Sequence, residues 1–109
     1  MFKVVSDRTF THDVEVLTPV DGGHEKQTFK ATFALVPLEE VKAVNINAID
    51  DVTMFLTKVV RHMDDLVDEK KQPLPYSAAL RDQLIQQADV RTGLMRAYGK
   101  ALTKAAEGN

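Results

Sequence analysis

The chain of 109 residues contains no cysteine. This absence excludes disulfide bonds, thiolate metal ligands and a cysteine nucleophile. The chain also has no apolar run that approaches the roughly 20 residues of a membrane-spanning helix. Its first residues, Met1 to Arg8, include neither the apolar stretch nor the cleavage site of a signal peptide. We therefore expect a soluble cytoplasmic protein.

An excess of basic residues is missing as well, since the formal net charge is −2. Proteins that gain affinity by neutralising phosphates concentrate lysine and arginine, so the charge argues against nucleic acid as the main partner. The apolar content of 44% and the charged content of 28% are ordinary for a globular protein. A chain of this length predicts a single domain, residues 1–109, with a real core.

The first third of the chain predicts an antiparallel β-hairpin, residues 1–37. Apolar residues alternate with polar ones from Phe10 to Val16 and again from Phe29 to Leu35. Between these runs, Asp21-Gly22-Gly23 has the residue types of a tight reversal. Residues 2–5 have the same alternation and suggest a short extra edge strand.

Residues 38–106 predict a helical part of about three helices packed on the hairpin, which makes the fold class α+β. One helical turn is expected at 38–43, and residues 44–49 are left unassigned. The clearest helix starts at Asp50 or Asp51 and continues to Met63, because its apolar residues follow a helical period. They are Val52, Phe55, Leu56, Val59, Val60 and Met63.

A ten-residue connector, Asp68 to Ser77, separates this helix from the rest. Pro73 and Pro75 remove two backbone donors, so no helix continues through it and we expect a fixed elbow. Ser77 then serves as the N-cap of the next helix, and Asp89 as the N-cap of the last one.

Catalytic and metal-binding patterns are not evident in the sequence. His12, His24 and His62 have no ligand spacing, and His62 is expected to meet Asp65 or water. The acidic run 64–69 lacks the order of a calcium loop and is interpreted as a solvated helix end. We therefore predict no enzyme activity, no cofactor and no metal.

Surface recognition is the remaining class of function. Arg91, Arg96 and Lys100, with Lys104, form a basic column on the last helix that suits an acidic partner. Our hypothesis is a groove, edged by the elbow and the last helix, that covers the apolar stripe of a partner helix. Tyr76 and Tyr98 are candidate anchors for a partner protein if they are exposed, although packing in the core is the first interpretation of both positions. The residues assigned to partner binding are Pro73, Leu74, Tyr76, Arg91, Arg96, Tyr98 and Lys100.

Several short motifs, taken in order, resemble the small tail assembly chaperones of long-tailed bacteriophages and prophages. They cover nearly the whole chain. The motifs are Pro19-Val20-Asp21-Gly22-Gly23, Thr28 to Phe33, Val36-Pro37, Phe55-Leu56, Val59-Val60, Val67-Asp68-Glu69, Pro73 to Ser77, Val90-Arg91 and Arg96-Ala97-Tyr98. The chain departs from the family at Met63, where tryptophan is frequent, and at Asp65, where glycine is frequent.

The resemblance implies a non-catalytic protein that acts in the bacterial host cytoplasm and is absent from the mature virion. Such chaperones keep the long, helical tape-measure protein in solution and help to recruit tail-tube subunits. In many members of the family a translational frameshift appends a second domain. The sequence is also compatible with a homo-oligomer. We expect no nucleic acid and no membrane partner. The alternatives are a structural tail completion or joining protein, and a small nucleic-acid-binding regulatory module built on the last two helices.

Overall fold

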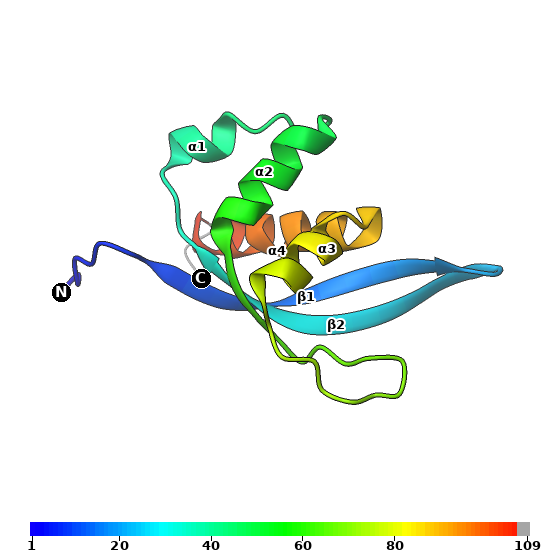
Figure 1. Cartoon of the computed structure of the whole chain (residues 1–109). Helices are drawn as coiled ribbons and strands as arrows, with labels where there is room; N and C mark the ends of the chain where they lie inside the picture. Colours follow the sequence, from blue (N-terminus) through cyan, green and yellow to red (C-terminus); the bar gives the residue numbers. More distant parts are fainter. Residues whose placement is uncertain (107–109) are drawn as a thin grey trace.

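The computed structural model describes residues 1–106, with side chains described for residues 1–103. In chain order the elements are β1 (Thr9–Val20), β2 (Gly23–Ala34), α1 (Leu38–Lys42), α2 (Ile49–Val59), β3 (Val60–Asp64), α3 (Ala78–Ile85) and α4 (Ala88–Ala106) (Figure 1). The three strands form one antiparallel sheet in the order β1-β2-β3. The predicted α+β class is confirmed.

The β1–β2 hairpin turns where the sequence predicts it. Val20 pairs with Gly23, and Gly22 between them has a φ of +80°, which glycine adopts without strain. Because strand side chains alternate between the two faces, Val14 and Phe29 lie opposite each other on the buried face. The predicted inward faces of both strands are therefore confirmed.

The other face of the hairpin is polar and exposed. The hydroxyl groups of Thr11 and Thr32 are hydrogen-bonded at 2.8 Å, and the ammonium group of Lys30 donates to Asp13 at 3.0 Å. This carboxylate raises the pKa of Lys30. Such cross-strand pairs stabilise an exposed face without burying charge. The helices accordingly cover only one face of the sheet.

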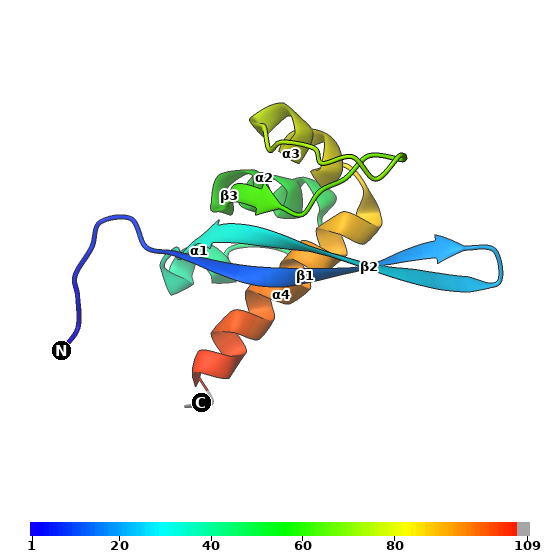
Figure 2. The ribbon, with the colours of Figure 1, turned by 90° about the horizontal axis from the view of Figure 1, so that it is seen from below.

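Helix α4 approaches strand β1 unusually closely, and it crosses the hairpin in Figure 2. A Cβ atom built on Gly93 would lie 2.6 Å from the carbonyl oxygen of Glu15, so only glycine permits this separation. Beyond the crossing, the hairpin projects away from the helices, and Leu17 and Val20 near its tip are exposed (Figures 1 and 2).

Tyr98 of α4 lies at the centre of an aromatic cluster in the core. Its ring centroid is 5.5 Å from that of Phe10, 5.4 Å from Phe33 and 5.3 Å from Phe55. These contacts join both strands of the hairpin to α2 and α4. Edge-to-face contacts of this kind add to the stability that comes from burial.

The predicted helix through Met63 is wrong in its last turn, because α2 ends at Val59 and the chain continues as β3. Met63 pairs with Ala31 and Val60 pairs with Phe33. Two residues separate Val60 from Met63 on β3, whereas only one separates Ala31 from Phe33 on β2. The extra residue, Arg61, forms a β-bulge. The bulge directs both Val60 and Met63 to the core, so a bulged strand reproduces the three-residue spacing of a helix.

The elbow therefore follows a strand and not a helix, and the acidic run 64–69 is not a helix end. The chain folds back on itself between Leu66 and Leu74, since the N–H of Leu74 donates to the carbonyl of Leu66 at 2.8 Å. The carboxylate of Asp68 accepts the N–H groups of Lys70 and Gln72, at 2.8 and 2.9 Å. No helix passes through the two prolines, as predicted.

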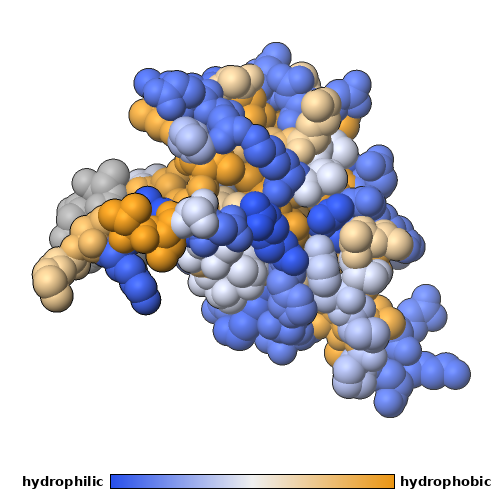
Figure 3. Space-filling view, turned by 60° about the vertical axis from the view of Figure 1, so that its left-hand side comes forward, coloured by the Kyte–Doolittle hydropathy of each residue, from blue (hydrophilic) through white to orange (hydrophobic). Residues whose placement is uncertain are grey.

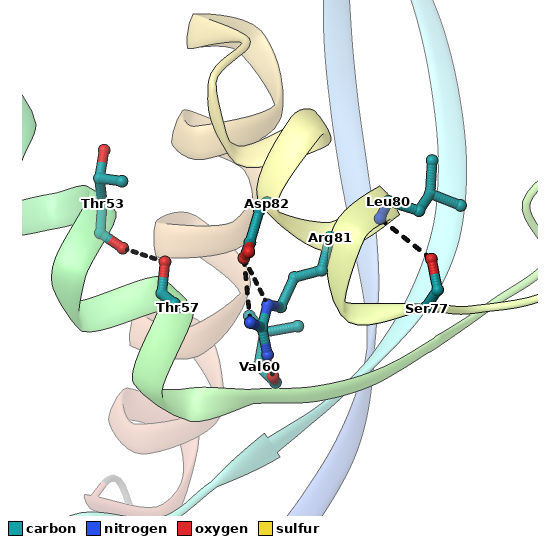
Figure 4. Close-up of polar contacts among 7 residues, drawn as sticks. All are labelled: Thr53, Thr57, Val60, Ser77, Leu80, Arg81 and Asp82. Atoms are coloured by element: carbon teal, nitrogen blue, oxygen red, sulfur yellow. Dashed lines mark hydrogen bonds and ion pairs between the residues drawn. The ribbon is translucent and has the colours of Figure 1, made fainter.

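Helix α3 begins as the sequence predicts and lies beside α2 (Figure 4). The hydroxyl of Ser77 accepts the N–H of Leu80 at 3.1 Å, which confirms the N-cap. Arg81 is mostly buried and donates to the carbonyl of Val60 at 3.4 Å while it pairs with Asp82. This arginine therefore connects α3 to the junction of α2 and β3.

Three smaller predictions are also corrected. Residues 2–5 form no strand. Asp89 is not an N-cap, because α4 begins one residue earlier, although its carboxylate accepts the N–H of Val90 and the hydroxyl of Thr18. His62 meets Asp64 at 2.9 Å and not Asp65.

Candidate functional site

The predicted partner-binding residues occupy three separate places in the fold. Arg91, Arg96 and Lys100 lie on α4, Tyr98 lies in the core, and the elbow residues lie on the far side of α3 (Figure 1). The structure therefore does not bring the elbow and the basic column into one groove. Lys104 lies outside the residues whose side chains are described.

Tyr98 does not reach the surface. Its side chain is 2% exposed, and its hydroxyl donates to the carbonyl of Ala34 at 3.0 Å and accepts the N–H of Val36 at 3.3 Å. Burial raises the pKa of Tyr98, and the hydrogen bond from Val36 lowers it by less. Its assignment to partner binding is wrong, and its role is to join α4 to the end of β2.

The elbow residues Pro73 and Leu74 are exposed, whereas Tyr76 is half-buried against the core. The Tyr76 ring lies 5.0 Å from the ring of His62. Leu66 and Val67, which precede the elbow, border a hollow of about 380 Å³ between the hairpin and the α3–α4 junction. No elbow residue lines this hollow or the depression beside the basic column.

The depression beside the basic column lies between α4 and the start of α2, and we call it the α2–α4 groove. Its volume is about 510 Å³. It is lined by Ile46, Ile49, Val52, Ala88, Arg91, Thr92, Met95 and Arg96. Two of the predicted partner-binding residues, Arg91 and Arg96, therefore belong to one surface with apolar neighbours.

The apolar part of this groove is open to solvent. Ile46 is 73% exposed and Ile49 is 62% exposed, whereas Val52 is buried at the base. Large aliphatic side chains exposed side by side are typical of surfaces that bind another molecule. The groove is therefore the candidate binding site.

The two arginines differ in how they are held. The guanidinium of Arg91 donates to the carbonyl oxygens of Ile85 and Gln86, at 3.0 and 2.9 Å, and so caps the end of α3. Arg96 is exposed and has no ion-pair partner among the described residues, and the same is true of Lys100. Arg91 thus has a fixed position, and Arg96 is free to pair with an incoming carboxylate.

Ile46, Ile49 and Met95 were missed by the sequence analysis. The sequence of residues 44–49 does not indicate one type of secondary structure. However, Ile46, Ile49 and Val52 are spaced by three residues and extend the apolar stripe of α2 towards the N-terminus. That spacing is the signal that identifies Ile46 and Ile49.

A second exposed apolar surface is the N-terminal segment. It extends away from the body of the molecule, as the orange projection in Figure 3 shows. Phe2 and Val4 are exposed, and the guanidinium of Arg8 lies 5.3 Å from the centre of the Phe2 ring. This segment does not line the α2–α4 groove.

Ionisable groups are all at least partly exposed within the described region, apart from the hydroxyl of Tyr98. No group of three or more histidine, aspartate or glutamate side chains there is arranged to hold a metal ion. No helix in this region is both long and apolar enough to cross a bilayer. The chemistry offered by the α2–α4 groove is thus apolar contact combined with positive charge.

Comparisons with protein-family models, with curated proteins and with solved structures found no match to this chain. The assignment of the α2–α4 groove as the candidate site therefore depends only on the residues and geometry of this chain.

Proposed function

We propose that this protein is a tail assembly chaperone of a long-tailed bacteriophage or prophage. It binds the tape-measure protein in the host cytoplasm, keeps it soluble and helps to recruit tail-tube subunits. The chain catalyses no reaction in this role. Its function depends on covering apolar surface that the tape-measure protein exposes before assembly.

The observation that supports the proposal most directly is the backbone at Asp65. This residue has a φ of +64°, the left-handed conformation that glycine adopts most readily. The family that the chain resembles frequently has glycine at this position. A departure from the family pattern thus falls where the backbone still requires the conformation that glycine allows.

The other departure agrees with the same reading. Met63 is 1% exposed and packs in the core. The family that the chain resembles frequently has tryptophan at this position, and tryptophan and methionine are both large apolar residues that suit a core. The two departures from the family pattern therefore fall on one backbone-constrained position and one core position.

Co-expression tests the proposal. The expected tape-measure protein, a long helical protein whose gene we predict downstream of this one, is produced in bacteria alone and together with the chain, and its soluble fraction is measured. We expect the tape-measure protein to aggregate alone and to elute with the chain when both are present. An unrelated aggregation-prone helical protein is the control. If the downstream protein stays insoluble in the presence of the chain, the proposal fails.

Purified particles separate the proposal from the structural alternative. A chaperone leaves before the tail is complete, so mass spectrometry of mature virions is expected to lack peptides of this chain. Their presence at a fixed ratio to the tail-tube subunit contradicts the proposal and supports a completion or joining protein.

A further inference from the structure

We infer that the α2–α4 groove binds an amphipathic helix whose apolar stripe has carboxylate side chains along both borders. The inference rests on the proposed function for one premise, that the chain acts by binding a helical partner. It adds the acidic borders of that partner helix, which the resemblance does not specify.

The first argument is the arrangement of side chains around α4. With 3.6 residues per turn, Arg91 and Arg96 lie about 140° apart around the helix axis. The remaining groove residues of α4, which are Ala88, Thr92 and Met95, fall in the sector between them. The basic groups thus occupy the two borders of a sector whose centre is small or apolar.

The opposite wall supplies the larger aliphatic groups. Ile49 and Val52 come from the first turn of α2, and Ile46 comes from the loop before it. A helix that enters the groove therefore meets isoleucine on one wall and methionine on the other. Apolar anchors spaced by three or four residues are the pattern that such grooves bind.

The length of the groove limits the contact. The lining residues of α4 extend from Ala88 to Arg96, a rise of roughly 12 Å. This length matches about two turns of a partner helix. The expected partner segment therefore has two or three apolar anchors, with acidic residues beside each end of the stripe.

Charge disfavours the chain's own N-terminal segment as the occupant. That segment is apolar, but Lys3 and Arg8 outnumber Asp7, so its net charge has the same sign as the borders of the groove. Like charges that meet at an interface cost affinity. An acidic helix of another protein fits the groove better than this segment of a second copy.

Two labelled helical peptides with the same apolar stripe test the inference. One has glutamate on both borders of the stripe and the other has lysine. Fluorescence anisotropy with the full chain at low ionic strength measures the dissociation constants. We expect the glutamate peptide to bind at least about fivefold more tightly, because each arginine then faces a carboxylate. Equal binding of the two peptides overturns the inference.

Three variants locate the site. Arg96→Glu is expected to abolish the preference between the peptides, because one border then stays basic and the other becomes acidic, whereas Ile49→Ser weakens both by about tenfold. Lys100→Glu is the matched control, because it changes the net charge equally on the same helix but does not line the groove. If Arg96→Glu and Lys100→Glu have the same effect, general charge explains the binding and the inference falls. Both Ile49 and Arg96 are exposed, so the fold survives and circular dichroism checks it.

Sedimentation of the chain alone tests whether a second copy of the chain occupies the groove. If the chain is a dimer that Ile49→Ser converts to a monomer, a second copy fills the groove and the inference is wrong. The outcomes also separate the two proposals. Peptide binding without solubilisation of the tape-measure protein removes only the chaperone function, whereas solubilisation that is unchanged by Arg96→Glu and Ile49→Ser removes only the groove.

Discussion

The hydroxyl of Tyr98 donates a hydrogen bond of 3.0 Å to the carbonyl oxygen of Ala34, 64 residues earlier in the chain. The same hydroxyl accepts the N–H of Val36. Ala34 is the last residue of β2, and Val36 lies just beyond it. The pairing of β2 with β3 ends at Phe33, so β3 offers no partner to these backbone groups. One side chain of α4 thus completes the hydrogen bonding of this strand end.

Tyr98→Phe is expected to lower the free energy of unfolding by about 1 to 2 kcal/mol. The ring and its aromatic contacts remain, but the buried carbonyl of Ala34 loses its donor. Urea denaturation measures the change. Thr11→Val is the control, since it removes a hydroxyl hydrogen bond on the exposed face and is expected to change stability by less than about 0.5 kcal/mol. Equal effects of the two variants contradict the role assigned to Tyr98.

The stability of the chain should also fall in alkali because of Tyr98. Burial raises the pKa of Tyr98 above the ordinary value of about 10. Above pH about 10 the unfolded chain releases this proton while the folded chain keeps it, so the unfolded state gains. The stabilisation is complete below that pH and is lost as the pH rises through the folded pKa.

Urea titrations between pH about 8 and about 11 test this sign. The unfolding free energy of the wild type should decrease more steeply above pH about 10 than that of Tyr98→Phe. Parallel curves for the two proteins show that another group is responsible.

Gly93→Ala is expected to destabilise the protein by about 1 to 3 kcal/mol. The new methyl group would lie 2.6 Å from the carbonyl oxygen of Glu15, which is backbone and moves only if β1 or α4 moves. Thermal unfolding followed by circular dichroism measures the loss.

Gly99→Ala provides the matched control on the same helix. Nothing lies within 4 Å of a Cβ atom at this position, and the residue is exposed. Alanine favours the helix over glycine by about 0.5 to 1 kcal/mol, so this variant should be slightly more stable than the wild type. If both alanine variants are stabilised, the close approach of α4 to β1 is incorrect.

Asp65→Gly is expected to raise stability by up to about 1 kcal/mol, because it relieves a left-handed backbone conformation. Part of the gain is offset by the greater freedom of glycine in the unfolded chain. Chemical denaturation again gives the measurement. Asp64→Gly is the comparison, since Asp64 is paired with Lys30 in the sheet and glycine weakens strands. Destabilisation by both variants removes the support that Asp65 gives to the proposed function.

Several parts of the fold were predictable because local patterns determine them. The alternation from Phe29 to Phe33 gave the buried face of β2, and Asp21-Gly22-Gly23 gave the turn. The side chain of Ser77 caps α3 as expected. Each of these features depends on residues close together in the chain, so tertiary contacts did not change them.

The candidate site was predictable only in part. The predicted basic column included Arg91 and Arg96, which line one wall of the groove, but the elbow was the wrong second wall. Ile46 lies just before α2 and Ile49 is its first residue, and no side-chain cap marks the start of this helix. Their apolar spacing was present in the sequence, although nothing local indicated that they would face α4.

The sequence alone determined the class of fold, the hairpin turn and the break at the two prolines, because each follows from backbone preference or from the period of the side chains. Only the tertiary structure decided that Val60 and Met63 belong to a strand. The free edge of β2 offers hydrogen bonds to residues 60–64, and the bulge at Arg61 lets both apolar side chains enter the core from a strand. Helix and bulged strand bury the same residues, so the choice between them depended on a partner about 30 residues away.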